Sequence, residues 1–368
     1  MRESPVAHVD LAVLDDNYRI VREHVAPGVA TMAMVKADGY GHGLEAVAKR
    51  LAAAGSEWFG VASPGEALAL RAAGVGSDVL LLSPIMDPGL ITRLCDLDVA
   101  LVATDEASVA RYLAADLPKP LRLHVKVDTG MGRLGLPPAA AAGVAEAVAR
   151  EPGLELEALW THFRDSDGPE RETTVWQIER FVEALDAAAL RGLQVPLRHA
   201  CNSAGILAYP EAHFDMVRPG ILLYGYAPSD AFAAAEPRVR PIMRLSAPVT
   251  FVKRVPAGTS VSYGQLWTAT ADATLATVRI GYADGYPRML TGKAWASLNG
   301  ARCPIVGRVC MDQLIVDASA AAGVAPGDRV TLWGGDGPSA DELASRLGTV
   351  SYEFITGVRP RVERESLG

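Results

Sequence analysis

The sequence predicts the α/β fold class: an N-terminal (β/α)8 TIM barrel followed by a mostly β C-terminal domain. In the first part of the chain, short β-like runs alternate with amphipathic helical runs. In the second part, β-like runs follow one another with turn residues and few helices between them. An alanine- and proline-rich segment over 227–241 separates the two parts. Because a barrel uses about 250 residues, the 368 residues have room for both, and we divide them into 1–232 and 233–368.

Eight strand-like runs in one series favour a closed parallel barrel over an open sheet. Glycine follows several helical runs, as at Gly55, Gly74 and Gly192, where it suits a helix C-cap. The expected strands lie near Val29–Lys36, Phe59–Ser63, Val79–Ser83, Val99–Thr104, Leu121–Asp128, Leu156–Phe163, Leu197–Ser203 and Met216–Tyr224. The expected helices are Leu44–Ala54, Pro64–Ala73, Glu106–Ala115, Ala139–Arg150 and Val175–Leu190.

The C-terminal part reads as a smaller β domain with one late helix, Ala340–Leu347, before a final strand. Turn residues such as Asn299-Gly300 separate its runs. The expected strands are Leu245–Val255, Thr274–Ile280, Ala294–Leu298, Cys303–Val316 and Asp328–Trp333.

Composition excludes several classes of function. The 35 basic and 43 acidic side chains give a net charge of −8, which disfavours nucleic-acid binding. No apolar run approaches the roughly 20 residues of a membrane helix, and the N-terminus lacks a signal-peptide core, so we expect a cytoplasmic protein. The four cysteines form no C-x-x-C and the seven histidines no metal-ligand spacing, so no metal site is expected.

Polar residues gather where the barrel strands are expected to end, and the C-terminal ends of its strands are where a TIM barrel builds its active site. This much charge at one rim indicates a ligand that receives it. The residues expected at the ends of strands 1, 5, 6 and 7, or within strand 8, are Lys36, Lys126, Arg133, His162, Asn202, Ser203, Arg218 and Gly220.

Lys36 is a candidate nucleophile. It follows the apolar run Met32–Val35 and precedes a glycine-rich loop. Desolvation there would lower its pKa and favour attack on a carbonyl, as in a Schiff base with pyridoxal 5′-phosphate (PLP). A surface lysine with a buried stem remains the alternative.

Two glycine-containing segments are candidate phosphate loops. Residues 130–135 match G-x-G-x-x-G, but Arg133 and the prolines 137–138 argue against a dinucleotide site. Gly220-Ile221, with Asn202-Ser203, lies where TIM barrels commonly hold phosphate, although ordinary turns are the alternative.

Together the segments resemble the alanine racemase family, PLP-dependent enzymes with a barrel and a β domain. The resemblance covers nearly the whole chain, and its first segment is close to the family's PLP-lysine signature. The segments are, in order, VKADGYGHG, KVDTGMGRLG, THF, HACNSAG, FDMVRPGILLYG, SVSYG, IGYADGYP, GRVCMDQ and SYE.

The resemblance implies a two-base racemase. Lys36 would carry PLP and act as one acid/base, and Tyr263 of the partner subunit in a homodimer would be the other. Arg218 would face the pyridine nitrogen, and His162 would link Arg218 to the tyrosine. Because two faces of one carbon exchange a proton, two bases on opposite sides are needed.

The remaining site residues follow from the same resemblance. Arg133 would contact the cofactor and the substrate carboxylate, and a carbamylated Lys126 would orient that arginine. Met311 and Tyr282 would border the substrate entrance from the other subunit. The residues implied to hold the cofactor are Tyr40, Asn202, Ser203, Gly220, Ile221 and Tyr352.

The expected activity is racemisation of L-alanine to D-alanine for peptidoglycan, with no metal, nucleic acid or membrane as partner. Alternatives are a serine or broad-specificity racemase, a barrel-type PLP decarboxylase, a nicotinamide dehydrogenase and a non-catalytic PLP carrier. The chain lacks the decarboxylases' triple-glycine loop and Cys-x-x-Gly-Asp segment. It departs from the racemase pattern at Arg164–Asp167 and at Gly357–Val362.

Overall fold

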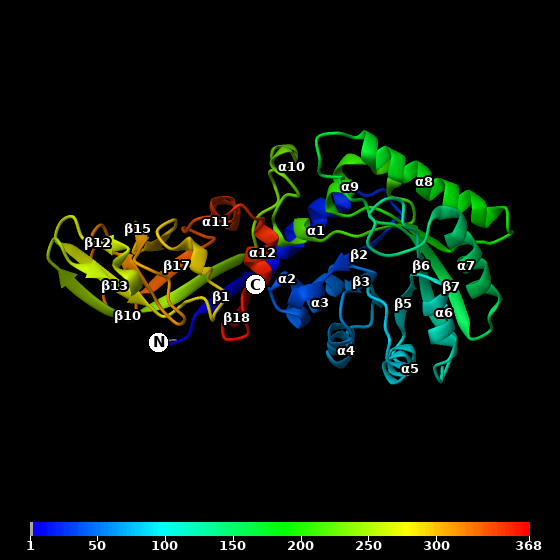
Figure 1. Ribbon diagram of the computed structural model, residues 1–368, viewed down its shortest axis with the longest axis horizontal. Coiled ribbons are helices and arrows are strands. Elements are labelled where there is room, and N and C mark those ends of the chain that lie inside the picture. Colours follow the sequence, from blue (N-terminus) through cyan, green and yellow to red (C-terminus); the bar gives the residue numbers. More distant parts are fainter. Residues whose placement is uncertain (1–2) are drawn as a thin grey trace. The chain divides into compact units, whose positions relative to one another are not determined.

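The structure is a computed structural model that describes residues 3–368 (Figure 1). The chain divides into two compact units. The barrel unit comprises 14–39 and 44–240, and the β-rich unit comprises the residues up to Val13, 40–43 and 241–368. Among the described residues, no helix is both long and apolar enough to span a bilayer.

Eight parallel strands close the barrel, each pairing with the next and the last with the first. All five residues of β5 (Val99–Ala103) are buried, as expected for a parallel strand covered on both faces. This confirms the predicted barrel. The other strands are β2 (Ala30–Met34), β3 (Trp58–Val61), β4 (Asp78–Leu81), β6 (Leu121–Lys126), β7 (Leu154–Trp160), β8 (Leu197–His199) and β9 (Met216–Val217).

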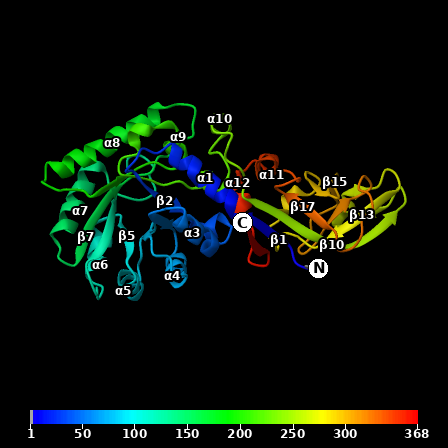
Figure 2. The same cartoon turned by 180° about the vertical axis from the view of Figure 1, so that it is seen from behind.

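Helices lie around the outside of the strands in both views of the barrel unit (Figures 1 and 2). The predicted helices are present, whereas α1, α5, α9 and α10 were not predicted, and α10 lies in the segment predicted as a linker. The Asp87-Pro88-Gly89 segment resembles a turn, but it begins α5 with Asp87 as its N-cap. The helices are α1 (Leu11–Glu23), α3 (Leu44–Ala53), α4 (Pro64–Ala72), α5 (Pro88–Asp96), α6 (Glu106–Leu113), α7 (Pro138–Arg150), α8 (Glu172–Ala189), α9 (Ser203–Ala208) and α10 (Asp230–Ala235).

Several strands end earlier than predicted, so the polar residues lie in the following turns. Lys36 opens a tight turn, α2 (Lys36–Tyr40), two residues after β2. His162 lies two residues beyond β7, and Ser203 is the first residue of α9. Arg218 follows β9, whose predicted continuation is the 3-10 turn η2 (Ile221–Tyr224). Lys126 does end β6, two residues before the predicted end at Asp128.

The β-rich unit contains an eight-stranded sheet in the order β13-β16-β15-β14-β17-β10-β1-β18. The N-terminal strand β1 pairs antiparallel with β10 and parallel with β18, so it lies in this unit and not in the barrel. The predicted boundary at 232/233 assigns β1 to the barrel domain instead. The sequence of a single short strand does not indicate which sheet the strand joins. The strands are β1 (Val6–Asp10), β10 (Met243–Val255), β13 (Ala273–Val278), β14 (Trp295–Leu298), β15 (Ala301–Val306), β16 (Leu314–Asp317), β17 (Arg329–Trp333) and β18 (Glu363–Leu367).

The predicted strand Cys303–Val316 is two strands, β15 and β16, joined by a loop. Gly307 has a φ of +64° there and ends β15. The late helix α11 (Ala340–Leu347) has the predicted bounds, with Ser339 as N-cap and Gly348 as C-cap. A further helix, α12 (Ser351–Thr356), and a small hairpin of β11 (Ser260–Val261) and β12 (Trp267–Thr268) were not predicted.

Candidate active site

The turn after β2 holds Lys36 in place through an unusual backbone. Ala37 and Asp38 have φ of +54° and +56°, a left-handed conformation that costs an L-residue roughly 1–2 kcal/mol. Hydrogen bonds support the turn, since Ala37 N donates to Glu66 Oε1 (2.6 Å) and Leu44 N donates to Asp38 Oδ1 (2.9 Å). Strained backbone that the surroundings hold in this way is typical of functional sites.

Glu66 is a functional candidate that the sequence interpretation missed. Its Oε2 accepts hydrogen bonds from the backbone N–H groups of Ala62 (2.9 Å) and Ser63 (3.0 Å) at the start of α4. The same carboxylate therefore ties the Lys36 turn to the neighbouring strand end. The Ser63-x-x-Glu66 spacing, a capping box, was the signal that could have found it.

The Lys36 amine has the electrostatic setting expected of a nucleophile. Burial, together with the charges of Arg133 and Arg218, lowers its pKa, and Glu66 opposes the shift. The amine is therefore more easily deprotonated than a free lysine.

Lys126 is a buried amine at the end of β6, with 3% of its surface exposed. Its Nζ donates to Val127 O (2.8 Å) and lies 4.8 Å from the ring centroid of Trp160. Burial, and then the charge of Arg218, lowers the pKa of Lys126 to about 7. Among residues 3–368 no carboxylate forms an ion pair with it, so a large fraction is neutral at pH 7.

The glycine loop 130–135 folds back onto β6. Asp128 Oδ1 accepts from the N–H groups of Gly130 and Gly132 (both 3.0 Å), so these amides are not available to a pyrophosphate. This contradicts the dinucleotide alternative. Arg133 is exposed on the loop. Arg164 also contacts this loop, because its Nη1 donates to Gly130 O (3.3 Å).

Arg218 is a buried cation held by carbonyls and histidines. Its Nη2 donates to Thr161 O (2.8 Å) and Ala200 O (2.7 Å), and its Nη1 donates to His199 Nδ1 (2.8 Å). The Nε–H has no acceptor among residues 3–368 and is left for a ligand. Burial lowers the pKa of Arg218 to about 10, so it stays charged at neutral pH.

His162 lies beside Arg218, with Nδ1 3.3 Å from Arg218 Nη2. Because a guanidinium only donates, Nδ1 accepts and the proton resides on Nε2. Burial, and then the charge of Arg218, holds the pKa of His162 well below its usual range. His162 is therefore a neutral ring with its Nε2–H directed away from Arg218.

The turns after β8 and β9 meet through Ser203, whose Oγ accepts from Gly220 N (2.9 Å) next to Ile221. Asn202 Oδ1 accepts from Gly205 N and from Ser166 Oγ, both at 2.9 Å. The Asn202 oxygen thus caps α9, which leaves the Nδ2 group as the part that could contact a ligand.

Five predicted site residues lie in the β-rich unit. Tyr40 and Tyr352 are neighbours there, with ring centroids 6.2 Å apart. Tyr282 N donates to Cys310 O (3.1 Å), which places the Tyr282 turn beside Met311. Tyr263 is 70% exposed and Met311 53% exposed. Both side chains therefore present more than half of their surface to solvent in a single chain.

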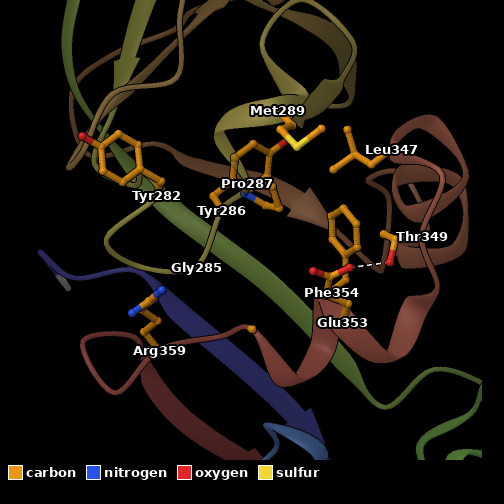
Figure 3. Close-up of a pocket in the computed structure, with 11 residues that line it drawn as sticks. Tyr282, Gly285, Tyr286, Pro287, Met289, Leu347, Thr349, Glu353, Phe354 and Arg359 are labelled. Atoms are coloured by element: carbon orange, nitrogen blue, oxygen red, sulfur yellow. Dashed lines mark hydrogen bonds between the residues drawn. The ribbon is translucent and has the colours of Figure 1, made fainter.

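A pocket of about 350 Å³ opens beside the Tyr282 turn (Figure 3). Tyr286, Met289 and Phe354 line it with apolar surface, and Thr349 donates to Glu353 beside Phe354. All lining residues belong to the β-rich unit.

Two buried histidines, His124 and His199, were also missed by the sequence interpretation. The polar residues Arg122, His124 and Lys126 alternate along β6 and so share one face of the strand, which was an available signal. Among the described residues, no cluster of histidine, cysteine or carboxylate side chains is placed to hold a metal ion.

Family models match almost the whole chain: the alanine racemase N-terminal domain over residues 9–228 and the alanine racemase C-terminal domain over 242–366. This chain belongs to the alanine racemase family. The alanine racemase of Desulfovibrio desulfuricans is 41% identical over 97% of this chain and 96% of its own length. That of Desulforamulus reducens is 39% identical over 100% of both chains.

Solved alanine racemase structures have the same fold. The E. faecalis enzyme matches with a TM-score of 0.92 and 34% identity over 99% of this chain and 98% of its own. The Bacillus anthracis enzyme, solved with bound L-Ala-P, matches with a TM-score of 0.94 and 34% identity over 100% of this chain and 96% of its own.

Alanine racemases depend on PLP, and the barrel unit fits that cofactor. Arg133 and Arg218 both lower the pKa values of Lys36 and Lys126, so two guanidinium charges act on both amines. A phosphate and a substrate carboxylate would offset this charge. The Lys36 amine and the unpaired Arg218 Nε–H match the carbonyl and the pyridine nitrogen that the cofactor presents.

Proposed function

We propose that this chain interconverts L- and D-alanine with PLP as cofactor. The observation that carries the proposal is the pairing of an amine with a lowered pKa, Lys36, with a buried arginine, Arg218, at one end of the barrel. An arginine stays protonated and does not readily pass its proton to the pyridine nitrogen. With such a partner the cofactor would be a weaker electron sink, which would favour proton return over transamination.

When bound, PLP withdraws electrons from the attached amino acid and so makes its α-proton acidic. Lys36 carries the cofactor and exchanges the proton on one face of the α-carbon. Tyr263 of the partner subunit exchanges the proton on the opposite face. His162, with its proton on Nε2, supplies a donor that orients the tyrosine oxygen.

Arg133 is assigned to bind the substrate carboxylate. Lys126 is assigned to carry a carbamate that orients Arg133. The largely neutral Lys126 amine supports this role, because only the neutral amine adds to CO₂ and releases a proton. A carbamate would replace the amine with an anion within electrostatic reach of Arg133 and Arg218. The residues assigned to the cofactor phosphate and its surroundings are Tyr40, Asn202, Ser203, Gly220, Ile221 and Tyr352.

We propose a homodimer in which each site takes Tyr263, Tyr282 and Met311 from the partner subunit. The exposure of Tyr263 and Met311 in a single chain supports this assembly. In this division of labour, residues 1–232 supply most of the cofactor contacts, and residues 233–368 supply Tyr352 and the second base. A cytoplasmic location and a role in peptidoglycan supply rest on membership of the family.

Subunit mixing tests the shared site. Lys36→Ala and Tyr263→Phe homodimers should each lose most turnover. After mixing and reassembly, half of the dimers would be hybrids with one intact site, so about a quarter of the wild-type activity should return. No recovery, with hybrid formation verified by mass spectrometry, would place both bases in one subunit.

Proton NMR in D₂O tests the reaction itself. With PLP and a mixture of L-amino acids, the α-proton signal of alanine should disappear while those of the others persist. Loss of the serine signal as well would indicate a broad racemase. A new methylene signal beside the amine would indicate decarboxylation, and no exchange would refute the proposal.

A further inference from the structure

A row of hydrogen-bonded side chains leads from Arg218 through the interior of the barrel unit. Arg218 Nη1 lies 2.8 Å from His199 Nδ1, and His199 Nε2 lies 2.9 Å from His124 Nδ1. His124 Nε2 lies 3.1 Å from Glu157 Oε2, and Glu157 Oε1 accepts from Arg122 Nη2 (2.6 Å). The row joins β6, β7, β8 and the turn after β9.

Aromatic rings hold the two histidines in these positions. Trp160 stacks on His199 with centroids 5.5 Å apart and an interplanar angle of 11°. Trp58 packs against His124 at 5.2 Å. Both histidines have no exposed surface, so neither ring has room to turn over or a water to replace its partner.

The two ends of the row determine where every proton lies. Arg218 can only donate, so His199 Nδ1 must accept and its proton must reside on Nε2. That proton points at His124 Nδ1, which must accept in turn, so His124 also carries its proton on Nε2. The last proton is donated to Glu157, which as a carboxylate can only accept.

The charges agree with this assignment. Burial is the largest cause that lowers the pKa of His124 and His199, so both rings are neutral. Although burial opposes ionisation of Glu157, hydrogen bonds from His124 and Arg122 hold its pKa below the usual range. Glu157 is therefore an anion, and it lies at the end of the row opposite Arg218.

We propose that Glu157, acting through His124 and His199, sets the direction of this hydrogen-bond row and thereby keeps Arg218 in place for the cofactor. The three are positioning residues, since none of them is assigned to cofactor or substrate. The inference rests on the proposed function for its effect on turnover, whereas the proton positions follow from the row itself.

Glu157→Gln makes the proposal testable. The amide has the same shape as the carboxylate, but one of its two terminal groups is an NH₂ donor and only the other is an accepting oxygen. Arg122 Nη1 pairs with Asp78 (2.7 Å), but its Nε and Nη2 both donate to Glu157 Oε1 (3.0 and 2.6 Å) and still need an acceptor there. The amide oxygen therefore turns toward Arg122 and the NH₂ group faces His124 Nε2. His124 Nε2 must then accept, which moves its proton to Nδ1 and reverses the whole row. His199 would then present an N–H to Arg218, two donors would face each other, and Arg218 Nη1 would lose its acceptor while Nη2 kept Thr161 O and Ala200 O.

The direct measurement is ¹⁵N NMR of histidine-labelled holoenzyme, which separates protonated from unprotonated ring nitrogens. In the wild type, His124 and His199 should carry the proton on Nε2 throughout the pH range of activity. In Glu157→Gln both protons should move to Nδ1. Glu155→Gln, the same change at an exposed position of β7, is the control and should leave both rings unchanged.

Turnover supplies a second readout. Glu157→Gln should lower kcat on the order of ten-fold, the effect of losing a hydrogen bond to a charged group. KM should change little, because Arg218 is assigned to the cofactor and not to the substrate. Glu155→Gln should match the wild type.

A double variant distinguishes an effect of hydrogen-bond direction from an effect of side-chain packing. In Glu157→Gln/Arg122→Met nothing forces the amide oxygen away from His124, so the Nε2 protons and part of kcat should return. A purely structural role predicts that the double variant is worse than the single one. If Glu157→Gln does not fold, Nδ1–H tautomers in the wild type would still overturn the proposal.

The two proposals fail separately. Reversal of the row in Glu157→Gln without any loss of kcat would overturn the positioning role while racemisation stands. A wild type that racemises no amino acid, yet shows both Nε2 protons, would refute the proposed function and with it the role of the row in turnover.

Discussion

Glu66 joins three backbone N–H groups from two neighbouring strand ends, and one of them belongs to the strained turn after Lys36. The position of the candidate nucleophile thus depends on a residue that touches no substrate. Lys126 also depends on residues around it, because burial and the charge of Arg218 lower its pKa.

Glu66→Gln should destabilise the Lys36 turn. An amide has one accepting oxygen, so the N–H groups on one side lose their partner, which costs about 1 kcal/mol at this partly exposed site. Urea unfolding should show that loss, and the holoenzyme should release PLP faster on dialysis. Glu106→Gln, a first-turn glutamate of α6, is the matched control; equal stability of both variants would contradict the clamp.

Lys126→Ala should lower activity and recover part of it with small carboxylates or chloride, because the lost carbamate is an anion. In the wild type, ¹³C-labelled bicarbonate should give a carbamate signal in ¹³C NMR. The signal should grow as pH rises through about 7, since the neutral amine is the reactive form. Lys49→Ala, an exposed lysine of α3, should keep the signal, whereas its presence in Lys126→Ala would refute the assignment.

The loop 130–135 shows how an element can match a motif and serve another purpose. Its glycines fit G-x-G-x-x-G, yet they bring the chain back against β6, where Leu136 N donates to Lys126 O (3.1 Å). Gly135 has a φ of +106°, and a Cβ there would lie 2.6 Å from Lys126 Cγ. The close approach requires glycine and keeps the loop that carries Arg133 against Lys126.

Gly135→Ala should therefore both unfold more easily and lose activity. The strain of a positive φ and the clash with Lys126 together should cost roughly 2–3 kcal/mol in urea unfolding. Gly143→Ala is the control with the opposite sign, because it lies inside α7 with nothing within 4 Å of the new Cβ. Gly143→Ala should raise the free energy of unfolding by about 0.5–1 kcal/mol. If Gly135→Ala leaves the free energy of unfolding unchanged, the loop is not tightly packed.

The fold as a whole keeps several histidines neutral by burial. Burial is the largest cause that lowers the pKa values of His124, His162 and His199. In the unfolded chain these groups return to a pKa of about 6.5. Between the folded and unfolded values, the unfolded state binds more protons, so the free energy of unfolding rises with pH.

Stability should therefore be fully present above about pH 6.5 and decrease as the pH falls below it. Each of these histidines can contribute up to about 1.4 kcal/mol per pH unit. Urea unfolding at pH 7.5 and at pH 5.5 checks the sign, and His124→Gln should give a shallower slope. A free energy of unfolding that does not change between the two pH values would contradict burial of neutral rings.

Much of the architecture was predictable, because it is encoded in short stretches of chain. The alternation of apolar strands and amphipathic helices predicted the barrel, and the late helix was predicted with the bounds that α11 has, between the caps Ser339 and Gly348. The motifs around Lys36, Arg218 and Tyr263 indicated the family that the comparisons show. These signals need no knowledge of what lies across the molecule.

What the chain alone could not provide was the set of partners that meet across strands. The register that places Trp160 opposite His199, and His124 opposite Ala158, brings residues 124, 157 and 199 into one row. Strand β1 likewise joins a sheet formed by residues beyond position 240. Local periodicity reflects only the backbone of a few residues, whereas hydrogen-bond partners and buried pKa values depend on which distant segments share a desolvated interior.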